Sequence, residues 1–141
     1  MNHPRIFGRQ EKLALIDMMV RARLSRRDRD FASCFTEDAI LVIYGDSSFM
    51  SCAGRWVGRS QIAEAVRLYD SALHTSNFRF DAPLIDQDQA AMRWNMTVAR
   101  RGGGCAAETK CLVHLKFRDW LINEFVIATD TALVTAMVNS G

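Results

Sequence analysis

The chain has 141 residues, of which 49% are hydrophobic and 24% charged, and its formal net charge is +2. This length suits one domain, and this composition is typical of an ordinary globular protein rather than of a disordered one. The small net charge, with acidic residues interspersed among the basic ones, argues against the unbalanced basic surface that nucleic-acid binding needs, and no apolar run approaches the length of a membrane span.

The four cysteines contain no Cys-x-x-Cys pair, and their spacing to the three histidines does not match a metal site. We therefore expect free thiols, no metal and no cofactor. The first nine residues contain no apolar stretch of signal-peptide length. Together these observations predict a cytoplasmic protein.

Three segments have the apolar spacing of helices. In residues 10–24 the apolar side chains recur about every 3.6 residues and the charged ones lie on the opposite side, which predicts an amphipathic helix. Similar spacing predicts a short second helix over residues 28–35 and a third over residues 60–73. Asp28 and Ser60 are residue types that cap helix N-termini, so we expect them to begin the second and third helices.

The remaining segments favour strands. Residues 39–44 are too short and too β-branched for a helix. Residues 77–85, 90–101, 106–117 and 120–128 follow with largely alternating patterns, and glycines at 102–104 supply a hairpin turn. A last segment, 131–138, is expected to be helical.

Helices followed by consecutive antiparallel strands indicate the α+β class. We expect a single domain over residues 1–141, with residues 1–9 as a loosely ordered arm. The predicted architecture is a cone-shaped, curved antiparallel sheet wrapped around the helices, which leaves an internal pocket of the kind that binds small molecules.

Three short motifs occur in this framework: Phe-Thr-Glu-Asp-Ala at 35–39, Gly-Arg-Ser-Gln-Ile at 58–62 and His-Leu-Lys-Phe at 114–117. Their order and spacing resemble the nuclear transport factor 2-like superfamily over residues 11–134, and most closely its SnoaL-like branch. That branch contains polyketide cyclases, dehydratases, isomerases and the small subunits of dioxygenases. The fold alone does not select among these activities.

The ketosteroid isomerases of this superfamily carry three polar groups that this chain lacks. The resemblance places their general-base aspartate at Ile43, their oxyanion-hole tyrosine near Met19 and their protonated carboxylic acid at Val113. Proton abstraction needs a base within hydrogen-bond reach of the substrate, and these side chains offer none. The resemblance therefore implies an apolar pocket instead of an isomerase site.

The scytalone-dehydratase-like and bile-acid-dehydratase-like members use a tyrosine, two aspartates and a histidine. The tyrosine and the first aspartate fall around Met19 and Leu24, and the second aspartate near Val98. The histidine is matched by His74, in His-Thr-Ser-Asn at 74–77. An imidazole whose ordinary pKa is about 6.5 can act as acid or base, but a histidine at a helix end can equally serve as a cap or a supporting group.

Other residues of the pocket are expected from the resemblance and from the strand pattern. Trp94, Met96 and Val98 share one strand face and form either a ligand-binding wall or plain core. Tyr69 on the third helix brings a hydroxyl toward the pocket, as a ligand contact or a structural one. Trp56 is expected at the pocket mouth.

Three functions remain open. The first is binding of a small apolar or polycyclic molecule in the pocket. The second is a cofactor-independent cyclase, dehydratase or isomerase that uses His74, and the third is a non-catalytic partner similar to the dioxygenase small subunits. In each case we expect a homodimer built on the outer strand face of Arg93, Asn95 and Thr97.

Overall fold

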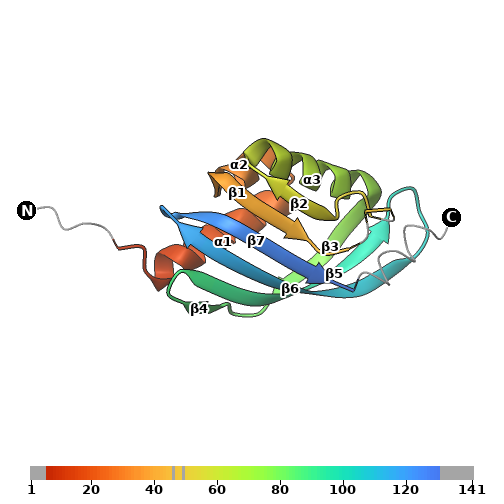
Figure 1. The fold of residues 1–141 in the computed structure, drawn as a ribbon. Helices are drawn as coiled ribbons and strands as arrows, with labels where there is room; N and C mark the ends of the chain where they lie inside the picture. The colour runs from red at the N-terminus through yellow and green to blue at the C-terminus, as the bar shows by residue number, and fades with distance from the viewer. Residues whose placement is uncertain (1–5, 46, 49, 131–141) are drawn as a thin grey trace, which may run out of the picture.

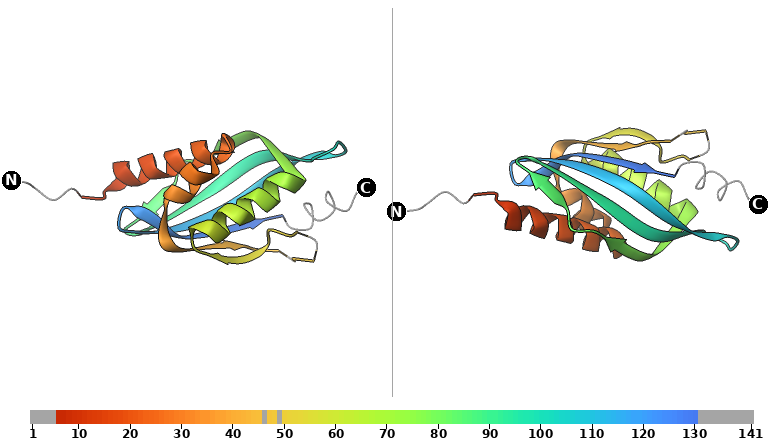
Figure 2. Two further views of the ribbon diagram at one scale, coloured as in Figure 1. Left: turned by 90° about the horizontal axis from the view of Figure 1, so that it is seen from above. Right: turned by 90° about the horizontal axis from the view of Figure 1, so that it is seen from below.

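The computed structural model describes residues 6–45, 47, 48 and 50–130. Three helices cover one face of a strongly curved sheet, and the opposite face carries no helix among the described residues (Figures 1 and 2). The elements in chain order are α1 (Arg9–Leu24), α2 (Asp28–Ser33), β1 (Phe35–Ile43), β2 (Gly54–Val57), α3 (Arg59–Ala72), β3 (Leu73–Phe80), β4 (Leu84–Asp86), β5 (Gln89–Arg100), β6 (Ala106–Arg118) and β7 (Leu121–Thr129).

The sheet has the order β2-β1-β7-β6-β5-β3, and β4 pairs with β5 outside this path. All pairs are antiparallel except β1 with β7, which are parallel. The predicted α+β class and curved sheet are therefore confirmed, and the expectation of a purely antiparallel sheet is corrected at this one pair.

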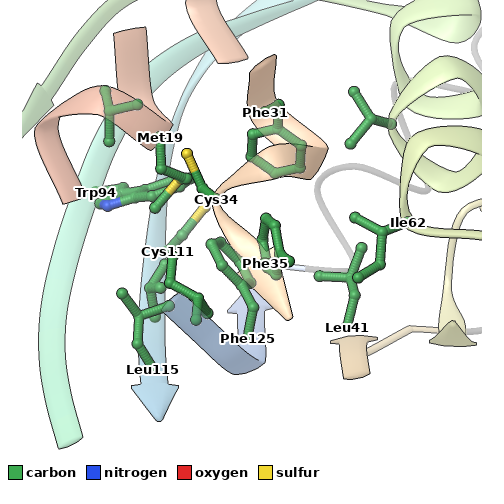
Figure 3. Packing of buried hydrophobic residues seen from close by; sticks show 14 of the residues in the cluster. Met19, Phe31, Cys34, Phe35, Leu41, Ile62, Trp94, Cys111, Leu115 and Phe125 are labelled. Atoms are coloured by element: carbon green, nitrogen blue, oxygen red, sulfur yellow. The ribbon is translucent and has the colours of Figure 1, made fainter. Parts of the chain in front are cut away.

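The strand patterns position the core as predicted. In β5 the even-numbered residues from Ala90 to Val98 are buried beneath the helices. The same face of β6 buries alternate residues from Thr109 to Phe117. Three phenylalanines from three elements close the core, with ring centroids 5.1 Å apart for Phe31 and Phe35 and 6.1 Å for Phe35 and Phe125 (Figure 3).

Several element boundaries differ from the sequence prediction. Residues 54–57 form an additional strand, β2, which pairs with β1. α3 then begins after Gly58, whose φ of 85° suits glycine. The N-cap positions of α2 and α3 are Arg27 and Gly58, without side-chain cap bonds, so the caps predicted at Asp28 and Ser60 are wrong. Gln61 instead accepts a hydrogen bond from the Val57 amide at 2.8 Å.

The segment after α3 also differs from the sequence prediction, and this difference changes the position of His74. Strand β3 begins at Leu73, directly after the helix, and a register shift separates Ser76 from Arg79. Asn77 in this interval has a φ of 51°, consistent with a β-bulge. His74 is therefore held on a paired strand rather than in a loop. The helix predicted at 131–138 lies outside the described residues.

Candidate functional site

A cavity of about 160 Å³ lies between the helices and the concave face of the sheet. Its walls come from α1, α2, α3 and five strands, so residues far apart in sequence meet there. The lining is mostly hydrocarbon, aromatic and sulfur-containing. It consists of Arg23, Leu24, Arg26, Phe31, Leu41, Ile43, Met50, Cys52, Ala65, Val66, Tyr69, Asp70, His74, Thr75, Phe78, Trp94, Met96, Val98, Thr109, Cys111, Phe125, Ile127 and Thr129.

Trp94 is the centre of an aromatic group at this cavity. Its ring meets Phe78 edge-on at 5.0 Å between centroids and Phe125 edge-on at 5.7 Å. Such T-shaped contacts are favourable because the positive edge of one ring meets the negative face of another. The three rings provide an apolar, polarisable wall suited to a flat or hydrocarbon ligand.

Six of the residues proposed from the sequence lie in the cavity lining: Ile43, Tyr69, His74, Trp94, Met96 and Val98. The structure places Met19, Trp56 and Val113 outside it. Met19 is completely buried between α1 and the sheet. Val113 is on the same face of β6 as Cys111 but one step farther along, where it pairs with Met92 in closed core.

Trp56 is on the edge strand β2, away from the cavity. Its indole Nε1 donates a hydrogen bond to the Cys52 carbonyl at 2.9 Å. Cys52 itself is a lining residue. The expected position of Trp56 at the pocket mouth is therefore corrected: the tryptophan supports a neighbouring segment of the wall.

An ion pair joins α1 to α3 beside the cavity. The Arg23 guanidinium donates to both carboxylate oxygens of Asp70, at 3.0 and 2.9 Å. Both side chains are only about one fifth exposed, at 20% and 18%. Arg23 also lies over the Tyr69 ring, 5.3 Å from its centroid, an arrangement that attracts a cation to an aromatic face.

Tyr69 brings a hydroxyl into this apolar surrounding. Its oxygen is 3.0 Å from Thr75 Oγ1, so it has a structural partner. Burial raises the pKa of Tyr69, a change that the Thr75 hydrogen bond partly offsets. The phenol therefore stays protonated near neutral pH and can orient a ligand, but it cannot serve as a base there.

The cavity thiols are also protonated. Burial is the main cause of the raised pKa of Cys52 and of Cys111. Because the thiolate is the nucleophilic form, these cysteines act as small apolar wall residues. The four cysteines are free, as expected from their spacing.

The mouth of the cavity carries an arginine and a histidine. Arg26 Nη2 lies 3.3 Å from His74 Nδ1, and both side chains are exposed while lining the cavity. A guanidinium can only donate, so Nδ1 accepts and a neutral ring carries its proton on Nε2. Asn77 and Tyr69, two polar residues close to His74 in sequence, do not orient the imidazole, because they bond to Thr97 and Thr75 instead.

Sequence reasoning missed the three charged residues of the lining. Arg23 and Arg26 belong to an arginine-rich stretch that is typical of a solvated helix end, and Asp70 was not singled out. Arg23 and Asp70 are 47 residues apart, and no periodicity connects them. Only the tertiary fold, which brings the C-terminal ends of α1 and α3 near each other, places them together.

The described residues contain no group of three or more histidine, cysteine, aspartate or glutamate side chains placed to hold a metal ion. Within the same part of the chain, none of the helices combines the length and the hydropathy required to traverse a membrane.

Solved structures share this fold at low sequence identity. A nuclear transport factor 2-like protein of Burkholderia pseudomallei K96243 is 13% identical, with a TM-score of 0.84 over 92% of this chain and 98% of its own. One from Burkholderia xenovorans LB400 is 13% identical, with a TM-score of 0.83 over 95% and 100%. TerC, co-crystallised with polyporic acid, is 14% identical, with a TM-score of 0.83 over 92% and 99%.

None of the curated proteins matches the chain. The sequence profile of the SnoaL-like domain family, however, matches residues 16–125, from α1 into β7. This match spans most of the chain, and the structural similarity covers nearly all of it. The chain therefore belongs to the SnoaL-like domain family.

Proposed function

We propose that this protein binds a small, largely apolar molecule in the cavity between its helices and the concave face of its sheet. The observation that carries the proposal is the aromatic wall of Phe78, Trp94 and Phe125 around a cavity of about 160 Å³. A dry apolar cavity of roughly 150 Å³ accommodates a benzene-sized molecule. The volume therefore favours a single ring over the polycyclic ligand considered from the sequence.

The fold is compatible with such a ligand. TerC, which shares the fold, was co-crystallised with polyporic acid. In this chain the walls are mainly apolar, with a few buried polar atoms such as Thr109 Oγ1 and Trp94 Nε1, and the exposed Arg26 and His74 lie at the mouth. A mainly apolar lining with a few polar groups is common in small-molecule sites. The wall would hold the ring, and the mouth would orient it.

Replacing Ile43 by tryptophan tests the proposal. Ile43 ends β1 and is half-buried in the lining, so the larger side chain should occupy the cavity. We expect the affinity for a benzene-sized probe such as toluene, measured by NMR titration, to fall at least about tenfold, or 1.4 kcal/mol.

Val42→Trp is the matched control. Val42 is the neighbour of Ile43 on β1, is also half-buried and lies outside the cavity lining. Its substitution should leave the affinity for toluene within about twofold. Equal losses in the two variants, or no binding of toluene to the wild-type protein, would contradict the proposal.

A second candidate function is acid–base catalysis by His74. The observation in its favour is the position of the imidazole at the cavity mouth, with Nδ1 fixed by Arg26 and Nε2 left to meet a ligand. The carboxylate of Asp70 is already hydrogen-bonded to Arg23, and burial raises the pKa of Tyr69 and keeps its hydroxyl protonated. Among the described lining residues, His74 is thus the group best placed for proton transfer.

His74→Gln tests this candidate, since glutamine retains hydrogen bonding but cannot titrate near neutral pH. General acid–base catalysis contributes about 10²- to 10⁴-fold, so kcat of a cyclisation, dehydration or isomerisation should fall by at least about 100-fold. Unchanged kcat on the same substrate would remove His74 from any catalytic role, while ligand binding by the cavity would stand.

We also propose that a second copy of the chain covers the open face of the sheet. A groove on this face is lined by Leu84, Ala91, Leu112, Val126 and Ala128 together with polar residues. Leu112 and Leu84 are 63% and 77% exposed. The Arg93–Asp81 ion pair at 2.9 Å and His114 border the groove. An apolar floor with a polar border is the pattern of protein interfaces.

The oligomeric state tests this second proposal. Light scattering at micromolar concentration should give the mass of two chains for the wild-type protein. Leu112→Asp should give the mass of one chain, because dimer formation would bury the new charge at the apolar floor. Met18→Asp is the control, since Met18 is similarly exposed, at 57%, but lies on α1. A monomeric wild-type protein would refute the dimer.

A further inference from the structure

Helix α1 ends in a backbone conformation that normally requires glycine. The Arg27 amide donates to the Ala22 carbonyl at 3.0 Å, and the Arg26 amide to the Arg23 carbonyl at 3.3 Å. This pair of bonds defines the Schellman motif, whose left-handed residue is usually glycine. Here that residue is Arg26, with a φ of 56°. A bulky side chain in this region is strained, and such strain directs attention to function.

The conformation of Arg26 directs its side chain to the cavity mouth. Its guanidinium meets His74 Nδ1 there at 3.3 Å. That contact uses one of five N–H donors and leaves the others for a ligand. His74 is fixed from the other side by the pairing of β3 with β5, where it lies opposite Ala99. The mouth thus presents two neighbouring groups of N–H donors on rigid elements.

The charge of Arg26 is not balanced within the described lining. The charged side chains of that lining are Arg23, Arg26 and Asp70. Both carboxylate oxygens of Asp70 are bound by Arg23. Arg26 therefore leaves one net positive charge at the mouth of a mainly apolar cavity, which favours an anionic group on the ligand. A carboxylate suits it best, because it matches the planar fork of a guanidinium.

We propose that the ligand is a monocyclic aromatic carboxylic acid, with its ring against Trp94 and its carboxylate bound by Arg26 beside His74. This inference rests on the proposed function of the cavity and adds the chemical class of the ligand. The cavity volume sets the size of the ring, and the position of Arg26 at the mouth sets the position of the charge.

Phenylacetate and phenylacetamide test the proposal, because they share a shape and differ in charge. Calorimetric titration of the wild-type protein should show at least about tenfold tighter binding of phenylacetate. Arg26→Gln should reduce this preference to about twofold or less, because the affinity for phenylacetate should fall more than that for phenylacetamide. Arg21→Gln is the matched control: it removes one positive charge from the same helix end, but Arg21 pairs with Asp17 in solvent. It should keep the preference.

Arg26→Gly separates binding from folding. Glycine relieves the left-handed strain, so Tm should rise by roughly 2–5 °C while the preference for phenylacetate is lost. A fall in Tm would show that Arg26 serves the fold, and would count against the proposal. Equal affinity of the wild-type protein for the two probes, or a preference that survives Arg26→Gln, would overturn it and leave the cavity function intact. Binding of neither probe would also overturn the proposal, and the toluene titration would then decide separately whether the cavity binds apolar molecules.

Discussion

Replacing Phe35 by alanine is expected to lower the free energy of unfolding by about 3–5 kcal/mol, the usual cost of truncating a fully buried aromatic residue. Phe35 is 0% exposed, and its ring packs between Phe31 and Phe125. It joins α2, β1 and β7, so the space it leaves cannot close without moving three elements (Figure 3). Urea denaturation followed by circular dichroism measures the change.

Phe78→Ala is the control for this prediction. Phe78 is a half-buried phenylalanine whose ring already borders the cavity. Its truncation enlarges an existing space and should cost only roughly 1–2 kcal/mol. A loss for Phe35→Ala no greater than that for Phe78→Ala would show that the core is not centred on the three phenylalanines. Since domains are stable by about 5–15 kcal/mol, the Phe35 variant retains little margin.

Most of the fold was predictable because the elements are long and regularly patterned. The buried positions of α1, such as Ile16, Met19 and Val20, follow the helical period, and β5 alternates over twelve residues. β2 was missed for the opposite reason. It has four residues, none of them buried, so its only structural signal is its pairing with β1. Short edge strands depend on tertiary pairing more than on pattern.

The candidate site likewise contains residues that the sequence pattern predicts and others that it does not. Strand alternation placed Trp94, Met96 and Val98 on one face, the family resemblance assigned that face to the pocket, and the structure puts all three in the cavity lining. Alternation identifies a face but not the depth along a strand, which is why Val113 shares the face of Cys111 and yet lies in closed core. The length of the cavity depends on how the helices cover the sheet.

The charged residues at and near the cavity mouth could not be predicted from the sequence. The arginines of 21–29 are typical of a solvated helix end, and that interpretation holds for Arg21, which pairs with Asp17 in solvent. Arg23 and Arg26 differ because the end of α1 turns toward α3 and β3. Their partners, Asp70 and His74, lie 47 and 48 residues away. The surroundings of each arginine therefore depend on the direction in which its side chain points from the end of α1: Arg21 points to solvent, whereas Arg23 and Arg26 point toward the cavity.

The Arg23–Asp70 pair is expected to be the strongest ionic contribution to stability among the described residues. Asp70→Ala leaves the Arg23 guanidinium without its bidentate partner at only 20% exposure. Removing one member of a buried pair costs about 3–5 kcal/mol. Because both side chains retain some contact with solvent, we expect a loss of roughly 2–3 kcal/mol in the free energy of unfolding, measured by urea denaturation.

Asp17→Ala is the matched control for the ion pair. The Arg21–Asp17 contact has the same length, 2.9 Å, and lies on the same helix, but its side chains are 74% and 52% exposed. Exposed pairs four residues apart on a helix contribute about 0.3–0.5 kcal/mol. Raising the salt concentration to 1 M should weaken this exposed pair more than the shielded one, because mobile ions screen solvent-exposed charges first. Similar losses for the two variants would mean that burial adds nothing to the Arg23–Asp70 pair.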